Sequence, residues 1–524
     1  MRKLTSAVFF IILSTSLFAQ APKNLTLLGT LNYPQQTLAG CWHYNQSSGK
    51  EYALVGAANG ISIVDISNPV TPIELVQLRG VQNLWHEIKV VGDYAFAVTE
   101  GQDPNGLWNG VQIINLSFLP DSAPNYFYMG DGVIANQLLK GHSITASGKT
   151  IYVNGHNITS LGRGVLIIDV NDPLNPVYEG AVTNRYCHDS YIRGNTIYTS
   201  DIGDGLFSVY DISNPVSPVL LATQNTPGNF NHNAWLNDDG HVLFTTDERS
   251  GSPVGAFDIS DLNNISLIDT FYNGNFTNNE AHNVRVINNF LINASYGSQV
   301  TIADAAYPDN IIETGSFVTG GSLCWDADPF PASGNIIVTD MNSGNLFILA
   351  PQYIRACYLV GMVTDSVTGL EIVNAAVDIL SPAVSKLTDF LGNYRTGYAD
   401  SGTYIVQYSK TGYVTKQISV TLQNGVQTIQ NVSLVPIGSG LHEFEPTDVI
   451  VFPNPSSEYV NISSPVSITG WKITDRIGRL VAKSSDNFIS GEKIQIDLNS
   501  LSAGSYSIEL KSATKSILRT LVKK

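Results

Sequence analysis

One phrase recurs along the first two thirds of the chain, and it restricts the possible folds more than any other feature of the sequence. An apolar stretch ends in Asp or Asn and is followed by a proline-containing turn, which is the pattern of a short β-strand and its turn. The clearest copies are ISIVDISNPVTP at 61–72, VLIIDVNDPLNP at 165–176 and FSVYDISNPVSP at 207–218, and weaker copies lie at 111–120, 255–264 and 300–309. Such repetition predicts an array of similar supersecondary units.

Histidines fix the period of these units. A His-containing strand precedes most copies of the phrase, and six histidines are separated by 43, 56, 46, 44 and 50 residues. They are His43, His86, His142, His188, His232 and His282. A further 44 residues leads to Asp326, which makes seven units of about four short strands each. Units of roughly 40–45 residues with four strands are the blades of β-propellers. We therefore predict an all-β chain in which residues 24–354 form a seven-bladed β-propeller.

The sequence also predicts which strand closes the ring. The last unit holds only three strands before the repeat stops, and the N-terminal NLTLLGTLNY is similar to the fourth strand of other units. We expect residues 25–32 to complete the last blade, because this pairing would remove an open sheet edge.

The repeat strings point to a family. The DISNPV phrases and the strings AHNVRV, CHDSYI, NHNAWL and PFPASGNIIVTD resemble the LVIVD-repeat proteins of the choice-of-anchor B family. The resemblance extends from about Asn24 to Ile354. It implies an exported protein with one of several kinds of C-terminal anchor, and no settled activity.

Two smaller domains are expected after the repeats. Residues 357–436 resemble carboxypeptidase regulatory-like domains through the G-x-V of 361–363 and the T-D-x-x-G-x-Y of 388–394. The resemblance implies a small Ig-like β-sandwich that serves as a spacer without catalysis. Residues 437–447 have the composition of a linker. In residues 448–524, the strings VFPNPSSEYVNI, GWKITDRIGRLVAK and IQIDLNSLSAGSYSIEL resemble a type A sorting domain of type IX secretion in Bacteroidetes-like bacteria. That resemblance implies a second small β-sandwich, contact with the secretion machinery, removal of the domain, and release or attachment to surface lipopolysaccharide.

Residues 1–20 have the layout of a signal peptide. Arg2 and Lys3 precede an apolar core from Ala7 to Phe18, and Ala19 offers a small residue for cleavage. The apolar run is too short to span a membrane, and no other stretch approaches that length. We therefore predict a secreted or cell-surface protein without a transmembrane span in its mature form.

Charge excludes one class of partner, while the cysteines leave a question open. The formal net charge is −16, whereas nucleic-acid binding needs clustered Lys and Arg, so we exclude nucleic acid. The four cysteines follow no metal-finger spacing, and most are expected to be buried thiols. A disulfide between Cys41 and Cys324, in the first and last units, would join the closure of the ring.

The repeated histidines are the main candidate site. Propeller geometry would place them around one mouth of the central channel, where the second strands also end. The residues at those strand ends are Glu100, His156, Asp201, Asp247 and Asp340. The preferred interpretation is structural, because a histidine repeated once per blade can bond a neighbouring strand. The competing interpretation is a site for zinc, iron or copper. The subset expected for a metal is His142, His188 and His232.

The sequence supports two functions. No phosphate-binding loop, zinc-protease helix or G-x-S-x-G motif is present. The leading hypothesis is a binding scaffold at the cell surface or outside the cell, with an unknown ligand. The alternative is a metal-dependent enzyme with a His/carboxylate site at one mouth of the propeller channel.

Overall fold

The computed structural model describes residues 21–274, 280–321, 323–437, 449–464, 467–489, 492–512 and 516–524. The predicted signal peptide and nearly all of the predicted linker lie outside these residues. The described residues contain β-strands and two 3-10 turns, η1 (Gly132–Ile134) and η2 (Thr159–Leu161), but no α-helix. Among them, no helix could serve as an apolar membrane span. The chain divides into two compact units, residues 1–435 and 436–524.

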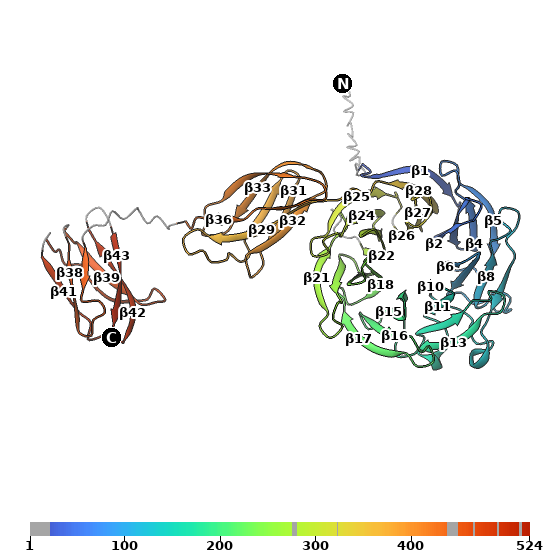
Figure 1. Ribbon diagram of the computed structural model, residues 1–524, viewed down its shortest axis with the longest axis horizontal. Helices are drawn as coiled ribbons and strands as arrows, with labels where there is room; N and C mark the ends of the chain where they lie inside the picture. The colour runs from blue at the N-terminus through green and yellow to red at the C-terminus, as the bar shows by residue number, and fades with distance from the viewer. Residues whose placement is uncertain are drawn as a thin grey trace, which may run out of the picture. The chain divides into compact units, whose positions relative to one another are not determined.

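Seven four-stranded antiparallel sheets follow one another around a ring in the first unit (Figure 1). Sheet 1 consists of β2 (Leu38–Asn45), β3 (Glu51–Ala57), β4 (Gly60–Asp65) and β5 (Ile73–Arg79). Sheet 2 consists of β6 (His86–Val91), β7 (Tyr94–Thr99), β8 (Val111–Asn115) and β9 (Asn125–Tyr128). Sheet 3 consists of β10 (Ser143–Ser147), β11 (Thr150–Asn154), β12 (Val165–Asp169) and β13 (Val177–Val182). Sheet 4 consists of β14 (Asp189–Arg193), β15 (Thr196–Asp201), β16 (Leu206–Asp211) and β17 (Val219–Asn225).

The remaining three sheets complete the ring. Sheet 5 consists of β18 (Asn231–Leu236), β19 (Val242–Asp247), β20 (Val254–Asp258) and β21 (Ser266–Phe271). Sheet 6 consists of β22 (Glu280–Ile287), β23 (Phe290–Tyr296), β24 (Gln299–Asp304) and β25 (Ile312–Val318). Sheet 7 consists of β26 (Cys324–Asp328), β27 (Ile336–Asp340), β28 (Asn345–Pro351) and β1 (Leu25–Asn32). The first strand of each sheet is innermost and lies beside that of the next sheet, and β26 lies beside β2.

The pairing of β1 with β28 closes the ring, as the sequence predicted. The two strands are antiparallel from Leu25 opposite Pro351 to Asn32 opposite Asn345. Leu25 is buried in the apolar core shared by sheets 6 and 7, whereas Leu27 is 44% exposed. The N-terminal strand therefore covers the edge that sheet 7 would otherwise leave open.

The repeated Asp or Asn of the sequence phrase has a local structural role. It ends the third strand of its sheet, and its side-chain oxygen accepts the backbone N–H of the residue two positions later, at 2.7–3.0 Å. Such a side-chain turn ends a strand without leaving the next N–H unpaired. The six residues are Asp65, Asn115, Asp169, Asp211, Asp258 and Asp304.

Two further sheets complete the first unit. One contains β29 (Cys357–Asp365) between β32 (Asn393–Tyr398) and β35 (Gln427–Ile429), with β36 (Val432–Leu434) also pairing β29. The other consists of β31 (Ala383–Leu387), β30 (Ala376–Leu380), β33 (Gly402–Ser409) and β34 (Lys416–Leu422) in that order. Their buried side chains form one shared apolar core.

The ring contacts these two sheets through a repeat residue. Asp304, which ends β24, accepts a hydrogen bond from the Ala356 backbone N–H at 2.8 Å and an ion pair from the Arg355 guanidinium at 2.5 Å. The Asn310 side-chain amide donates to the Thr396 carbonyl at 2.9 Å. The connection after β28 is thus held by hydrogen bonds as well as by the chain.

The second unit also has two sheets around one core. The first consists of β37 (Ile450–Phe452), β38 (Tyr459–Ser463) and β41 (Lys493–Asp497). The second consists of β40 (Leu480–Ser484), β39 (Gly470–Thr474), β42 (Gly504–Lys511) and β43 (Ser516–Lys523).

Candidate functional site

A pocket in the middle of the ring is lined by side chains from the innermost strands of sheets 2 to 7. Successive residues of these strands form levels along the channel. In sheets 3 to 7, one residue of each innermost strand pairs with the corresponding position of the second strand of the same sheet, and these residues form one level. They are Ser143, Asp189, Asn233, Asn283 and Asp326. The residue before each of them forms the next level. Its members are His142, His188, His232, His282 and Trp325.

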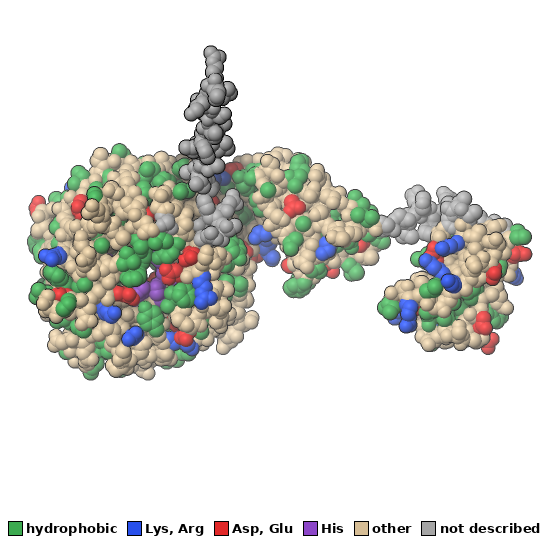
Figure 2. All heavy atoms as spheres, turned by 180° about the vertical axis from the view of Figure 1, so that it is seen from behind, with side chains coloured by type: hydrophobic (Ala, Val, Ile, Leu, Met, Phe, Trp, Pro, Cys, Tyr) green, Lys and Arg blue, Asp and Glu red, His purple; other side chains and the backbone are tan. Residues whose placement is uncertain are grey.

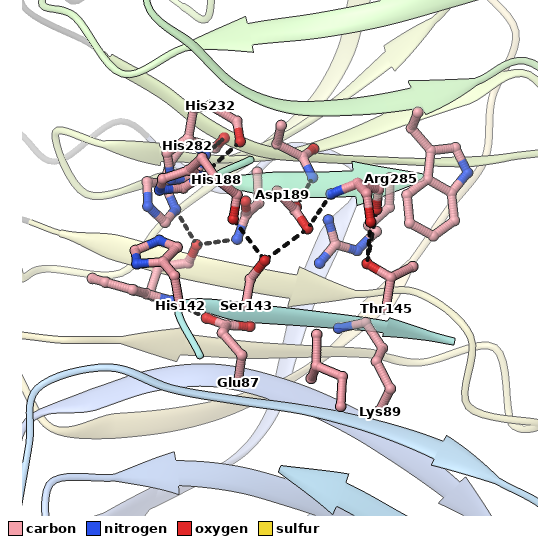
Figure 3. Close-up of a pocket in the computed structure, with 16 residues that line it drawn as sticks. Glu87, Lys89, His142, Ser143, Thr145, His188, Asp189, His232, His282 and Arg285 are labelled. Carbon is pink, nitrogen blue, oxygen red and sulfur yellow. Dashed lines mark hydrogen bonds between the residues drawn. The ribbon is translucent and has the colours of Figure 1, made fainter. Parts of the chain in front are cut away.

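Four of the predicted histidines lie together at this level. Figure 3 shows His142, His188, His232 and His282 gathered on one side of the pocket. The ring centroids of successive histidines are 4.0, 4.2 and 4.1 Å apart. On the face drawn in Figure 2, histidine side chains are visible near the middle of the ring with acidic side chains beside them. We call these four residues the histidine row.

Backbone carbonyls fix the orientation of three histidines in the row. Nδ1 of His188 bonds the carbonyl of His232 at 2.9 Å, Nδ1 of His232 bonds that of His282 at 2.9 Å, and Nδ1 of His282 bonds that of Trp325 at 2.6 Å. A carbonyl only accepts hydrogen bonds, so each Nδ1 carries the proton. In the neutral ring the Nε2 atom then keeps its lone pair. The predicted structural role is therefore present, and it leaves Nε2 as the free ligand atom.

Three histidines of the row, His188, His232 and His282, are held in their neutral form. Burial, reinforced by the neighbouring histidines, holds the pKa values of His188 and His232 well below the usual range. Burial lowers the pKa of His282 to about 3, and its Nε2 has no hydrogen-bond partner among the described residues. Neutral imidazole is the form that binds metal ions.

The first histidine of the row has a carboxylate partner instead of a carbonyl. Nδ1 of His142 lies 2.7 Å from the Glu100 carboxylate. This hydrogen bond is the main reason that the pKa of Glu100 is lowered. Glu100 is the one predicted strand-end carboxylate that the structure pairs with a histidine of the row.

A second carboxylate, Glu248, faces the middle of the row. One ligand atom from each of His188, His232 and Glu248 lies within 4.8 Å of the other two. Burial raises the pKa of Glu248, and the nearby Glu280 raises it further. The Tyr296 ring lies against His282, with centroids 4.3 Å apart, and Tyr296 also interacts with Glu248.

The structure corrects the predicted positions of two histidines. In β2 the level of the row falls at Ala39, whose carbonyl accepts the Thr339 hydroxyl as the His282 carbonyl accepts the Thr246 hydroxyl. His43 lies four residues further along β2, where it pairs with Ala53. His43 bonds Asp328 through its backbone N–H at 2.6 Å and its Nδ1 at 2.8 Å. His86 starts β6 but is buried in a different pocket, beside Trp108 and Gln112.

The seventh member of the predicted set is also different. Trp325, and not Asp326, occupies the level of the row in β26. Its indole N–H donates to the Glu87 carboxylate at 2.9 Å. Burial is the largest of several influences that raise the pKa of Glu87 to about 7.

The other predicted strand-end residues stabilise loops. The carboxylate of Asp247 accepts the backbone N–H groups of Gly228 and Phe230, each at 2.8 Å. Asp201 accepts a hydrogen bond from Ser208 at 2.5 Å, and Asp340 accepts one from Thr319 at 2.5 Å. His156 is fully buried, and its Nδ1 accepts the Ile158 backbone N–H at 3.1 Å. None of these four is in the group formed by His188, His232 and Glu248.

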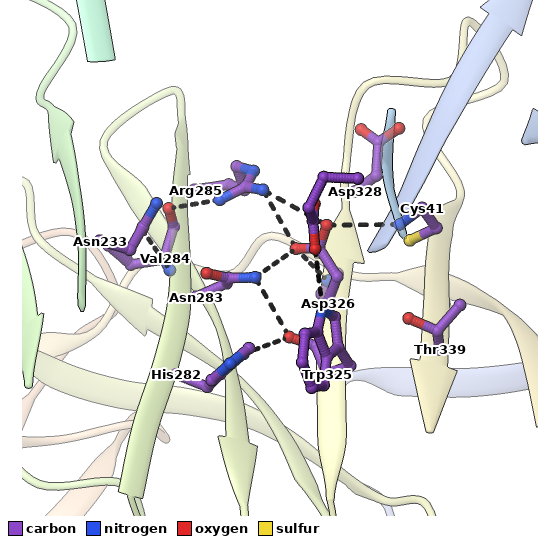
Figure 4. Close-up of polar contacts among 12 residues, drawn as sticks. Cys41, Asn233, His282, Asn283, Val284, Arg285, Trp325, Asp326, Asp328 and Thr339 are labelled. Carbon is purple, nitrogen blue, oxygen red and sulfur yellow. Dashed lines mark hydrogen bonds and ion pairs between the residues drawn. The ribbon is translucent and has the colours of Figure 1, made fainter. Parts of the chain in front are cut away.

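The level next to the row joins neighbouring sheets through side chains. The Asn233 amide donates to Asp189 at 2.6 Å, and its oxygen accepts the Val284 backbone N–H at 3.0 Å. Figure 4 shows the centre of this network at Asp326. The Asp326 carboxylate takes the Arg285 guanidinium at 3.1 Å, the Asn283 amide at 3.3 Å and the Cys41 backbone N–H at 3.5 Å.

Cationic and aromatic side chains occupy the other end of the channel. Lys89 is 7% exposed, and its ammonium lies 4.1 Å from the Trp42 ring centroid and donates to the Ile88 carbonyl at 3.0 Å. The Arg285 guanidinium lies 5.1 Å from the Trp235 ring. Phe330 lies between the tryptophans, 5.9 Å from Trp42 and 5.7 Å from Trp235. Three residues of strand, about 10 Å, separate this end from the histidine row.

Two groups of residues were not identified from the sequence. Glu248 directly follows Asp247, the last residue of β19, so the strand-end pattern points to its neighbour and one residue further to Glu248. Lys89 and Arg285 stand three residues after His86 and His282. Strand alternation would place such residues on the face opposite to a channel-facing histidine, and only the bulge at His282 brings Arg285 into the channel.

The cysteines are buried thiols, as expected, and the disulfide considered between Cys41 and Cys324 is absent. All four cysteines are free and buried, and Cys41 Sγ lies 3.6 Å from the Ile337 carbonyl. Burial raises the pKa of the Cys41 and Cys324 thiols well above the usual value. The closure of the ring is therefore held by strand pairing and packing.

Comparison with known families identifies two parts of the chain. Residues 450–524 match the secretion system C-terminal sorting domain, and residues 48–78 and 185–226 match the LVIVD repeat. The sorting domain supports type IX secretion to the cell surface or the extracellular space, and it implies interaction with the secretion machinery. No curated protein matches the chain.

Proposed function

We propose that this chain is an exported seven-bladed β-propeller of the choice-of-anchor B type that binds a small ligand in its central channel. In this proposal residues 24–354 are the propeller, 357–436 are a carboxypeptidase regulatory-like β-sandwich, 437–447 are a linker and 448–524 are the sorting domain, itself an Ig-like β-sandwich. The LVIVD matches and the seven four-stranded sheets support the propeller. The sorting-domain match supports export, with residues 1–20 as the signal peptide.

The observation that carries the binding role is the environment of Lys89. This ammonium is almost buried in the channel wall, yet no carboxylate oxygen of the described residues lies within 4.0 Å of it. Glu87 in the same pocket interacts with Lys89 only at longer range. A buried cation without a direct ion pair is costly unless a bound anion or a π-face compensates it. Trp42 supplies the π-face, and Arg285 and Trp235 lie nearby. We therefore infer a ligand with an acidic group and a flat apolar face, such as an acidic sugar.

A binding screen with acidic and neutral oligosaccharides on purified protein tests this function. We expect acidic members to raise the unfolding temperature by mass action and Lys89→Gln to weaken that binding at least about tenfold, since a charged hydrogen bond contributes roughly 1.5–3 kcal/mol. Lys50→Gln is the matched control, because Lys50 lies on the surface and pairs with Asp65. Equal binding by the Lys89 and Lys50 variants would reject the channel as the binding site.

A metal-dependent enzyme is the second candidate, favoured by one observation. Glu87 lines the same pocket as the histidine row, and its pKa of about 7 suits a general acid or base near neutral pH. Hydrolysis of chromogenic ester and glycoside substrates, measured with and without a chelator, tests this candidate. Turnover that is lost with chelator and in Glu87→Gln supports it, and the absence of turnover after metal addition rejects it.

A further inference from the structure

Two neighbouring imidazoles of the histidine row are prepared as metal ligands by their own backbone contacts. Nδ1 of His188 and of His232 donates to the carbonyl of the next histidine, at 2.9 Å in both cases. Metal-binding histidines commonly donate their second ring N–H to a backbone carbonyl or a carboxylate, which fixes the tautomer and the ring orientation. Each Nε2 lone pair is thus available, and the ring centroids are 4.2 Å apart.

A carboxylate converges on the same two rings. Ligand atoms of His188, His232 and Glu248 lie within 4.8 Å of one another, which small rotations would bring to the distance of about 2.0–2.2 Å that zinc has from nitrogen and oxygen ligands. Glu248 is partly buried near a second acid, Glu280. Two acids and the imidazole lone pairs of His188 and His232 lie together, an arrangement that a divalent cation would stabilise.

We propose that His188 Nε2, His232 Nε2 and the Glu248 carboxylate bind one divalent transition-metal ion, with zinc as the expected ion. Two imidazoles and one carboxylate are a ligand set found in zinc sites with an open fourth position. Calcium and magnesium prefer oxygen ligands, so the two nitrogens select against them. This metal site rests on the proposed function in one respect, because both place the bound ligand in the central channel.

The open fourth position connects the site to the channel. His142 and His282 flank the two ligands in the row, with centroids 4.0 Å from His188 and 4.1 Å from His232. Nε2 of His282 is buried and has no hydrogen-bond partner in the described part of the chain, so its lone pair is a further ligand atom beside the ion. The bonds from Nδ1 to the carbonyls stabilise the ring with or without metal, but they do not account for the position of Glu248.

Zinc titration of the full chain tests the site directly. Protein that has been dialysed against a chelator and then against buffer should bind one equivalent of zinc in a calorimetric titration. After the unbound zinc is washed away, elemental mass spectrometry should measure one zinc ion per chain. Glu248→Gln keeps the shape of the side chain and should weaken binding at least about tenfold, the lower range for losing support at a metal site. His188→Phe keeps a ring in the row and should abolish uptake. His241→Ala, an exposed histidine outside the channel, is the control.

The outcomes separate the metal site from the binding function. Uptake of less than one equivalent by the wild-type protein, or equal affinity of the wild type and Glu248→Gln, overturns the metal site. The Glu248 variant decides the matter even if His188→Phe does not fold, which its far-ultraviolet circular dichroism would reveal. Lys89→Gln should bind zinc as the wild type does, so failure of the oligosaccharide screen with normal zinc uptake rejects the proposed ligand and leaves the metal site.

Discussion

At the scale of single residues, histidines at the same position of the repeat make different contacts. His188 and His232 bond backbone carbonyls and face the channel, whereas His86 is buried in a separate pocket. His156, outside the repeat position, accepts a backbone N–H through Nδ1. The surroundings, and not the histidine itself, set each protonation state.

His156 makes a testable contribution to acid stability. Burial lowers its pKa from 6.5 to about 4. The unfolded chain therefore takes up a proton between pH 6.5 and 4 that the folded protein does not, so the free energy of unfolding falls as the pH falls through this range. We expect this residue to account for a loss of up to about 3 kcal/mol. His156→Asn should remove this pH-dependent loss, because asparagine does not titrate. The variant should still fold, because the Asn side-chain oxygen can accept the Ile158 N–H.

Urea unfolding at pH 7.5 and pH 4.5 measures the effect. The difference in unfolding free energy between the two pH values should be smaller for His156→Asn than for the wild type. His241→Asn is the control and should behave as the wild type does, because His241 is exposed. An unchanged difference in the His156 variant contradicts the assignment.

At the scale of elements, the ring depends on a strand that comes from the other end of its sequence. β1 pairs β28 and contributes Leu25 to the core between sheets 6 and 7. Without this strand, sheet 7 would expose an unpaired edge. The short apolar sequence before the first repeat is therefore part of the last sheet.

Two leucines of β1 provide a matched test. Leu25→Ala should lower the unfolding free energy by about 2–4 kcal/mol, because Leu25 is 2% exposed and its truncation leaves a cavity. Leu27→Ala, at a site 44% exposed, should cost less than about 1 kcal/mol. Denaturant unfolding of both variants gives the comparison, and similar losses would show that β1 does not close the ring through its buried face.

A repeat residue also holds an element outside the ring. Asp304→Asn should keep the hydrogen bond from the Ala306 N–H but lose the charge that pairs with Arg355. Its amide N–H₂ would then face the Ala356 N–H, so two donors would oppose each other. We expect a loss of roughly 1–3 kcal/mol and faster protease cleavage between 351 and 357. Asp258→Asn is the control, because Asp258 makes the same turn with Ser260. Equal cleavage in both variants would exclude a role of Asp304 in holding this connection.

At the scale of the whole molecule, the sorting domain determines the expected processing. The match over residues 450–524 supports export, so the mature protein from the native host should lack residues after about Glu445 and before about Gln20. Mass spectrometry of the extracellular protein checks both ends. Recovery of the peptide GWKITDR, residues 470–476, from the mature extracellular form would contradict removal of the domain.

Export and the repeat architecture could be predicted from the sequence alone, because their signals are local. An apolar strand, a terminal Asp and a proline turn lie within a dozen residues. The side chain of this Asp makes the same turn in sheets 1, 3 and 4. The strand that closes the ring was also predictable, since its sequence is similar to those of other fourth strands. These features depend on residues that are neighbours in the chain or copies of one another.

The composition of the candidate site was decided by the tertiary structure. His43 lies beside Asp328, four residues past the level of the row in β2, and a spacing counted in residues cannot reveal which register position a residue occupies in its strand. Glu248 and Lys89 belong to no repeated motif, and they gain significance only where the strands of several sheets bring them beside His188 or Trp42. Charge, burial and the separation of ligand atoms are properties of that convergence, because they arise between residues on different strands and, for His188 and Glu248 or Trp42 and Lys89, on different sheets.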